Sequence, residues 1–221
     1  MTREAYHNAL KGVQDDVREM AEMVGAALKA SMDALKSRDI GLSKQIMKND
    51  IEVNRKRFDI EEKCIQLIAT QQPMAVDLRT LASIINIITD LERIGDHAEG
   101  IAKISVSIGD GPLVKPLVDM PVMADKALSM LNRCMQAFVD RDVEASKKIC
   151  DEDDEVDALY DEIYTELVHL MIKDPKIIKD ATYLIWTAHN IERIADRVTN
   201  IAERVVYMVT GKMQEMNVSK Y

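Results

Sequence analysis

Along most of the chain, apolar residues recur at steps of three and four positions, the spacing that places side chains on one face of an α-helix. The clearest stretch starts at Leu78 and continues through Leu81, Ala82, Ile84, Ile85, Ile88, Leu91, Ile94, Ala98, Ile101 and Ala102. None of the five prolines interrupts a long stretch of this kind, as expected because proline lacks the N–H that an inner helical turn requires. The pattern predicts six helices, over residues 3–36, 40–70, 75–108, 118–139, 142–172 and 176–212.

Prolines and glycines mark where the predicted helices end. Pro73 and Pro175 each lie in a short polar connection, so the helices on either side are expected to run antiparallel. The segment 109–121 contains two glycines and three prolines and is the best candidate for a link between two halves. We therefore expect an all-α fold of two tandem, repeat-related three-helix bundles, the first over residues 1–110 and the second over residues 111–221.

The two halves resemble each other at an offset of 100 residues. Leu91-Glu-Arg-Ile-Gly-Asp96 matches Ile191-Glu-Arg-Ile-Ala-Asp196, and apolar positions on both sides of these segments also correspond. Asp50-Ile-Glu-Val-Asn54 resembles Asp153-Asp-Glu-Val-Asp157 less closely. Internal similarity of this kind predicts two copies of one supersecondary unit.

Composition narrows the class of protein. Hydrophobic residues make up 47% and charged residues 30% of the chain, typical of a globular protein, and the aromatic content of 4% favours helix over sheet. The net charge of −9 disfavours binding to nucleic acid or to anionic membranes. No stretch has the pattern of a secretory signal or a membrane span, and the three cysteines form no metal-binding pair. We expect a cytoplasmic protein with buried free thiols.

Acidic residues occupy equivalent positions in the two halves and are the main candidates for chemistry. Glu92 and Asp96 are four residues apart, as are Glu192 and Asp196, so each pair lies on one edge of a helix. If the chain reverses near Pro73 and again near Pro175, residues at similar distances from each proline lie level. The hairpins then assemble two acidic groups: Asp50, Asn54, Glu92 and Asp96 in the first half, and Asp153, Asp157, Glu192 and Asp196 in the second.

Oxygen donors alone suit a hard cation such as Mg²⁺, Mn²⁺, Ca²⁺ or iron, whereas structural zinc prefers cysteine or histidine. The same arrangement in both halves favours metal binding over the alternative, in which the acids pair with arginines or lysines on solvated helix faces. A ferritin-like di-iron site is not expected, because one Glu-x-x-His step, Glu4/His7, is at the N-terminus and the other, Glu166/His169, is near Pro175. The acidic run 150–157 is typical of a helix start, where the helix dipole favours negative charge.

Three segments resemble the signatures of the PhoU family, the accessory proteins of phosphate transport. They are Gln72-Pro-Met-Ala-Val-Asp-Leu-Arg79, Asp90-Leu-Glu-Arg-Ile-Gly-Asp96 and Asn190-Ile-Glu-Arg-Ile-Ala-Asp196. The resemblance covers nearly the whole chain and implies acidic motifs that bind metal ions, sometimes as multinuclear iron clusters, at the two acidic groups above. Asn54 stands in place of an acid, which implies a weaker first site. Since the second half lacks the Gln-Pro…Asp-Leu-Arg segment, any partner-binding role of Asp77 and Arg79 is confined to the first half.

The resemblance implies a regulator rather than an enzyme. Members of the family restrain phosphate uptake and the phosphate-starvation response, link the ATPase of a phosphate ABC transporter to a sensor histidine kinase, and are often homodimers. The acidic residues alone leave two alternatives: a metal-dependent all-α hydrolase of nucleotides or polyphosphate, and a metal-binding scaffold or storage bundle. The sequence contains no glycine-rich phosphate loop or nucleophile elbow that would favour the hydrolase.

Overall fold

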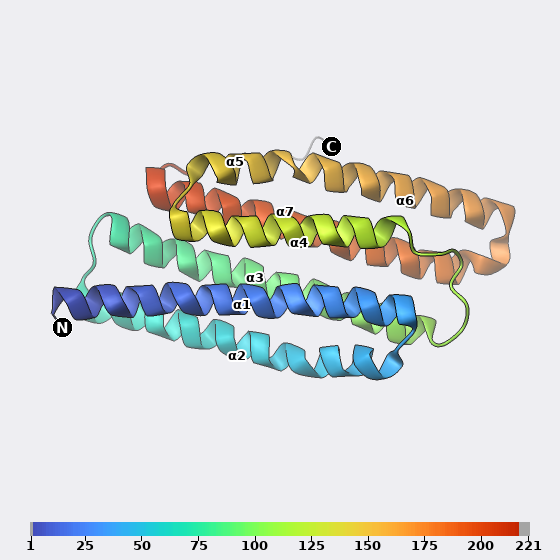
Figure 1. Cartoon of the computed structure of the whole chain (residues 1–221), viewed down its shortest axis with the longest axis horizontal. Helices are drawn as coiled ribbons and strands as arrows, with labels where there is room; N and C mark the ends of the chain where they lie inside the picture. The colour runs from blue at the N-terminus through green and yellow to red at the C-terminus, as the bar shows by residue number, and fades with distance from the viewer. Residues whose placement is uncertain (1, 217–221) are drawn as a thin grey trace.

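The computed structural model describes residues 2–216, and within this range the chain forms helices and no strands (Figure 1). The first bundle consists of α1 (Arg3–Ser37), α2 (Ile40–Gln71) and α3 (Val76–Ile108). The second consists of α4 (Asp119–Asp140), α5 (Val143–Asp151), α6 (Asp153–Lys173) and α7 (Ile178–Thr210), with a 3₁₀ turn at Pro175–Ile177 before α7. The two bundles lie side by side in an elongated molecule (Figure 1). Five of the six predicted helices are confirmed to within two residues at each end.

The helix predicted over 142–172 is wrong in one respect, because it is interrupted at Glu152. Residues 151–155 are five consecutive acids. Acids are unfavourable in a last helical turn and favourable in a first turn, because the helix dipole is negative at its C-terminus and positive at its N-terminus. The new start places Asp153, Asp154 and Glu155 in the first turn of α6. The interruption therefore supplies the helix N-terminus that the acidic run favours.

The turns between α1 and α2 and between α4 and α5 are built in the same way. Arg38 and Arg141 adopt left-handed backbone conformations with φ of 60° and 56°. The following residues, Asp39 and Asp142, cap the next helix, each accepting a hydrogen bond of 2.9 Å from the backbone N–H three residues later. This Arg-Asp turn is a further repeat between the halves, which the comparison of acidic motifs missed.

The two bundles are joined through α3 and α7, which run antiparallel and share the most extensive contact between any two elements. Both helices contribute fully buried side chains to the core, among them Leu91 and Ile94 on α3 and Ile191 and Ile194 on α7. Burying a side chain of this size contributes about 1.5–3 kcal/mol relative to leaving it exposed. The central helix pair therefore carries much of the core and fixes how the halves sit together.

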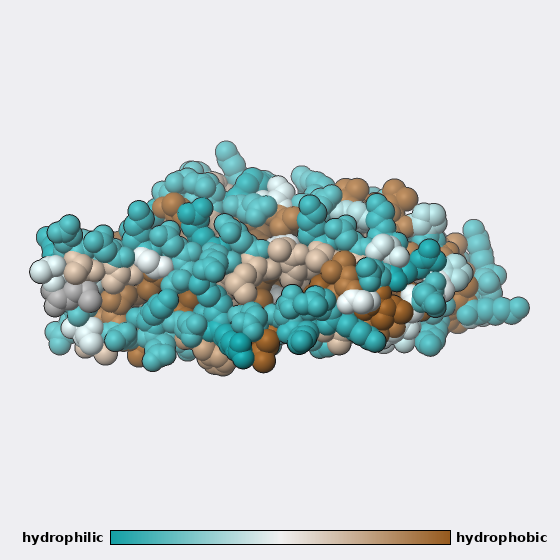
Figure 2. Space-filling view, turned by 60° about the horizontal axis from the view of Figure 1, so that its bottom comes forward, coloured by the Kyte–Doolittle hydropathy of each residue, from teal (hydrophilic) through white to brown (hydrophobic). Residues whose placement is uncertain are grey.

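The cysteines and the surface agree with the sequence-based expectations. Cys64, Cys134 and Cys150 are free and buried, and burial raises the pKa of the Cys64 and Cys150 thiols to about 12. The face brought forward in Figure 2 is mainly hydrophilic, with apolar side chains gathered in separate patches. Among residues 2–216, no helix is both long enough and apolar enough to span a membrane.

Candidate metal centres

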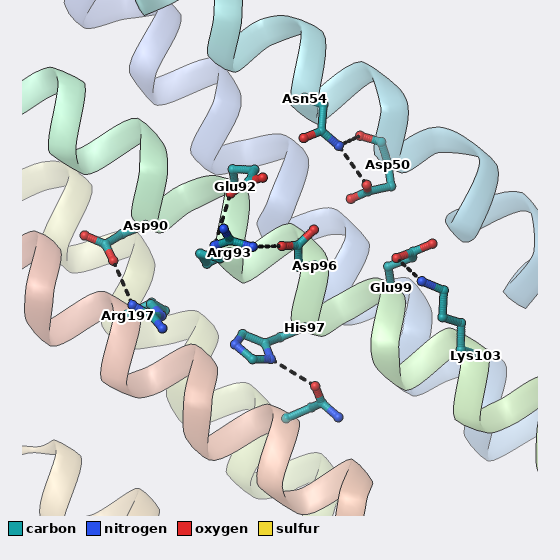
Figure 3. Close-up of polar contacts among 11 residues, drawn as sticks. Asp50, Asn54, Asp90, Glu92, Arg93, Asp96, His97, Glu99, Lys103 and Arg197 are labelled. Carbon is teal, nitrogen blue, oxygen red and sulfur yellow. Dashed lines mark hydrogen bonds and ion pairs between the residues drawn. The ribbon is translucent and has the colours of Figure 1, made fainter.

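The first acidic group assembles where α2 faces α3 (Figure 3). On α2, Nδ2 of Asn54 donates a hydrogen bond of 2.9 Å to Oδ2 of Asp50. On α3, Arg93 lies between the two acids, with Nη1 2.8 Å from Oδ2 of Asp96 and Nε 3.5 Å from Oε2 of Glu92. The hairpin therefore brings the predicted residues to one level, but local amide and guanidinium partners already contact three of them.

The carboxylates of the first group lie close enough to repel one another. Burial and the negative charges of Glu99, Asp96 and Glu92 raise the pKa of Asp50, and the ammonium of Lys103 only partly opposes this. Glu99 is a member that sequence reasoning missed. It follows Glu92 by seven residues and so shares its helix edge, a spacing that was available in the sequence.

An open groove of about 490 Å³, lined by residues of α1, α2 and α3, reaches the first group. Asp50, Gly95 and Glu99 line one part of it. Gly95 allows α3 to approach α2 closely, because a Cβ at this position would lie 3.3 Å from Cγ1 of Val53 and 3.4 Å from Oδ1 of Asp50. Solvent, and any ion dissolved in it, therefore has access to the carboxylates of Asp50 and Glu99.

The second acidic group lies between α6 and α7 and is more deeply buried. Asp153 is 1% and Glu192 4% exposed, while Asp157 and Asp196 are half-buried. Burial and the charges of Asp157 and Asp196 raise the pKa of Asp153 to about 7. Burial and the charge of Asp196 raise the pKa of Glu192 to about 7 as well. Asp161, one helical turn beyond Asp157, adds to this negative potential and was also missed from the sequence.

Positive charge near Glu192 is limited. Arg193 places Nη1 2.8 Å from Oδ2 of Asp196, and its Nε lies 3.6 Å from Oε2 of Glu192. Nδ1 of His189 lies 3.2 Å from the same Glu192 oxygen, but burial and the charge of Arg193 lower the pKa of His189, which keeps the imidazole neutral at pH 7. Oε2 of Glu192 is buried and accepts no well-formed hydrogen bond. A cation beside this oxygen would offset the cost of burying the Glu192 carboxylate near other negative charges, which Arg193 and the neutral His189 do not remove.

The donor chemistry of both groups fits a hard cation, but the geometry is not preformed. Within the described part of the chain, no three His, Cys, Asp or Glu side chains converge tightly enough to hold a metal ion as they stand. Asp96 and Asp196 instead turn toward Arg93 and Arg193. Coordination would require these two aspartates to rotate away from their arginines, which is a small change at half-exposed positions.

Asp77 and Arg79, predicted to bind a partner, make contacts within the chain. Burial and the neighbouring Asp77 charge raise the pKa of Tyr6 on α1. Nε of Arg79 donates a long hydrogen bond of 3.5 Å to the carbonyl of Met208, and its guanidinium lies beside Gly211, the C-cap of α7. A cation is favourable at a helix C-terminus, so Arg79 stabilises the end of α7. A role in partner binding stays a prediction for both residues.

The two Glu-x-x-His steps are far apart, as the sequence indicated. Glu4 and His7 begin α1 at one end of the molecule, whereas Glu166 and His169 are near the end of α6 at the other (Figure 1). Glu166 pairs with Lys115. These residues therefore do not form a shared di-iron site.

The fold and the acidic groups define a class of duplicated all-α proteins, in which two three-helix bundles carry repeat-related clusters of oxygen donors. The family model for the PhoU domain matches this chain twice, at residues 17–105 and 120–205. The chain belongs to the PhoU family.

Relatives and solved structures match over nearly the full length. The phosphate-specific transport system accessory protein PhoU homolog of Clostridium acetobutylicum is 34% identical, covering 98% of this chain and 100% of its own. The Aquifex aeolicus homolog is 35% identical and covers 92% of each chain. The crystal structure of PhoU from Pseudomonas aeruginosa has a TM-score of 0.89 at 30% identity, covering 94% of this chain and 100% of that one. The phosphate transport system regulatory protein PhoU from Streptococcus pneumoniae has a TM-score of 0.89 at 28% identity, with coverage of 95% and 99%.

Proposed function

We propose that this chain is a non-catalytic regulator that restrains phosphate uptake and the phosphate-starvation response when phosphate is plentiful. The observation that carries the proposal is the similarity, over nearly the full length, to proteins named as accessory or regulatory components of phosphate transport. In this role the chain acts in the cytoplasm as a homodimer and as an adaptor between the ATPase of a phosphate ABC transporter and a sensor histidine kinase.

The acidic groups are proposed to bind divalent or trivalent metal ions, with iron, Mn²⁺, Mg²⁺ and Ca²⁺ as candidates. The second site would be formed by Asp153, Asp157, Glu192 and Asp196, and the first by Asp50, Asn54, Glu92 and Asp96. A bound cation would neutralise the repulsion within each group and hold together the two helices that supply it. The first site is expected to be weaker because Asn54 contributes a neutral oxygen.

The regulatory proposal is tested in phosphate-fed cells that lack the gene and carry a reporter for a starvation-induced promoter. We expect derepression in these cells and repression on return of the wild-type gene. The variant Glu92→Gln/Asp96→Asn/Glu192→Gln/Asp196→Asn should restore repression only in part. Full repression in cells lacking the gene would rule out negative control.

The adaptor role is tested by affinity capture from solubilised membranes of phosphate-fed cells, read by mass spectrometry. We expect recovery of a phosphate-transporter ATPase or a sensor kinase. Reproducible absence of both, with a folded bait, would contradict the adaptor.

The two alternatives make separate predictions for purified protein. A hydrolase would release phosphate from a nucleotide in the presence of Mn²⁺ or Mg²⁺, and Glu92→Gln with Glu192→Gln would abolish the release. If the acids only make the surface soluble, elemental analysis would find the same metal content in the wild type and in the variant with all four substitutions, Glu92→Gln/Asp96→Asn/Glu192→Gln/Asp196→Asn. We expect no phosphate release and a metal content that falls in the variant.

A further inference from the structure

Large apolar side chains are exposed along the outer side of α2. Ile51, Phe58 and Ile65 are 53%, 59% and 54% exposed, whereas Ile60 on the core side of the same helix is fully buried. Steps of seven residues return to nearly the same direction around a helix, so the three side chains form one row about 21 Å long. We refer to Ile51, Phe58 and Ile65 as the α2 stripe.

The α2 stripe is complementary to itself. Ile51 and Ile65 lie at equal distances before and after Phe58. If two copies of α2 pack antiparallel about a two-fold axis beside Phe58, each Phe58 meets Phe58 of the second copy and each Ile51 meets Ile65 of the second copy. A two-fold interface requires this property, because the same surface serves both subunits.

Charged residues beside the stripe favour the antiparallel arrangement. Arg55 and Glu62 lie on the same flank of the stripe, one before and one after Phe58, and both are exposed. Antiparallel pairing about a two-fold axis brings equal flanks together, so Arg55 of each copy faces Glu62 of the other. Parallel pairing would instead bring Glu61 of one copy against Glu62 of the other, where like charges repel.

Arg55 is free to change partner. Its contact with Glu52 within the helix, at 2.8 Å, joins side chains that are 64% and 55% exposed. A pair as exposed as this contributes little to stability, so exchanging it for Glu62 of a second copy costs little.

We infer that the α2 stripe is the interface of a homodimer, occupied by the α2 helix of a second copy that crosses antiparallel at Phe58. This inference rests on the homodimer of the proposed function and specifies its surface. Asp50 and Asn54 lie on the α3 side of the stripe, so the interface borders the first acidic group.

Cross-linking tests the two-fold position of residue 58. In a Phe58→Cys variant the new thiols of two copies face each other, and copper–phenanthroline in air is expected to join them, giving a band of doubled mass on a non-reducing gel. The native cysteines are buried and contribute little background. Ile172→Cys is the matched control, because Ile172 is 72% exposed on α6 and lies outside the stripe. On the non-reducing gel this control should run largely at the mass of a single chain, because its thiols do not meet in the dimer.

Analytical ultracentrifugation completes the test. We expect the wild type to be a dimer. Phe58→Asp should raise the dissociation constant of the dimer about tenfold or more and leave the helicity unchanged. Arg55→Glu should weaken the dimer to a similar extent, and the double variant Arg55→Glu/Glu62→Arg should restore it. A wild-type monomer at tens of micromolar would overturn both this interface and the proposed homodimer. A dimer that survives Phe58→Asp and gives no selective cross-link at residue 58 would overturn the stripe alone and leave the regulatory proposal standing.

Discussion

Nδ1 of His97 lies 3.0 Å from Oδ1 of Asn190, so a hydrogen bond joins the two repeats across the contact between α3 and α7 (Figure 3). The repeat equivalents of these residues also meet, with Nη1 of Arg197 3.4 Å from Oδ1 of Asp90. Exchanging the two repeats converts one contact into the other, because His97 corresponds to Arg197 and Asn190 to Asp90. α3 and α7 therefore cross about a pseudo-two-fold axis, with a neutral pair on one side and an ion pair on the other.

We expect Arg197→Leu to lower the free energy of unfolding by about 1–3 kcal/mol, because the partly buried Asp90 then loses the arginine that contacts it directly. Burial already raises the pKa of Asp90 despite the presence of Arg197, which shows that the pair carries a desolvation cost. The double variant Asp90→Leu/Arg197→Leu should therefore recover much of the loss. Urea denaturation of both variants measures the two values.

The control for this pair is Lys147→Leu, which removes an ion pair with Glu144 between side chains that are 45% and 76% exposed. It should change stability by less than about 0.5 kcal/mol. A double variant as unstable as Arg197→Leu would show that the ion pair is a net stabiliser of the α3–α7 contact.

Glu192→Gln is expected to stabilise the metal-free protein by about 1–3 kcal/mol at pH 8, because it removes a buried charge whose pKa is raised to about 7. The same variant should lose most of the rise in melting temperature that Mn²⁺ causes in the wild type. Thermal unfolding with chelator and with Mn²⁺ measures both effects.

Glu162→Gln provides the comparison for Glu192→Gln, since Glu162 is an exposed acid on α6. It should leave the metal-free stability and the response to Mn²⁺ close to those of the wild type. Equal responses to Mn²⁺ in wild type and Glu192→Gln would exclude Glu192 as a ligand.

The pKa of Asp16 is lowered in the folded protein, whereas the pKa values of the buried acids Asp153 and Glu192 are raised, so its charge stabilises the fold while theirs destabilise it. Burial alone would raise its pKa, but hydrogen bonds from Lys56 and Lys63 at 2.8 and 2.7 Å outweigh this and lower it. A lowered folded-state pKa stabilises the protein above the unfolded pKa of about 4, and the contribution is lost as pH falls through the folded pKa. Asp16→Asn should therefore cost about 1 kcal/mol between pH 5 and pH 8 and almost nothing near pH 2.

Urea titrations of the wild type and of Asp16→Asn across this range provide the measurement, with Asp15→Asn as the exposed control. A stability difference between wild type and Asp16→Asn that persists unchanged near pH 2 would mean that the charge of Asp16 is not the source of its contribution.

Arg79→Ala is expected to weaken the last turn of α7 by about 0.5–1 kcal/mol, because it removes the cation that lies beside the carbonyl of Met208 in that turn. The N–H of Gly211 donates a hydrogen bond to the carbonyl of Tyr207. Faster amide hydrogen exchange at Gly211 would therefore measure the weakening of this turn. Lys212→Ala, which removes an exposed cation just beyond the same helix end, should leave the exchange rate unchanged. Unchanged exchange in Arg79→Ala together with poorer capture of a partner would assign Arg79 to partner binding instead.

Helix positions followed from the sequence because they depend on local spacing. Steps of three and four apolar residues, with proline and glycine between them, located both ends of α3 to within one residue. The same spacing could not locate the interruption at Glu152, because apolar periodicity continues from α5 into α6. Its cause is the preference of an acidic run for the positive end of a helix dipole.

The acidic groups also followed from the sequence, since equal distances from Pro73 and from Pro175 bring residues of two antiparallel helices to one level. Both groups assemble as the hairpin geometry predicted. Glu99 and Asp161 escaped notice because the comparison rested on matched motifs, and neither residue belongs to one.

The sequence by itself therefore determined the helices, the duplication and the level at which the acids meet, since each depends on spacing along one chain. Tertiary structure alone decided how deeply each acid is buried. Glu192 and its repeat equivalent Glu92 lie in the same motif, yet only Glu192 is nearly inaccessible, at 5% side-chain exposure against 14%. Burial depends on the helices packed around each position, and the α6–α7 hairpin covers its acids more completely than the α2–α3 hairpin does.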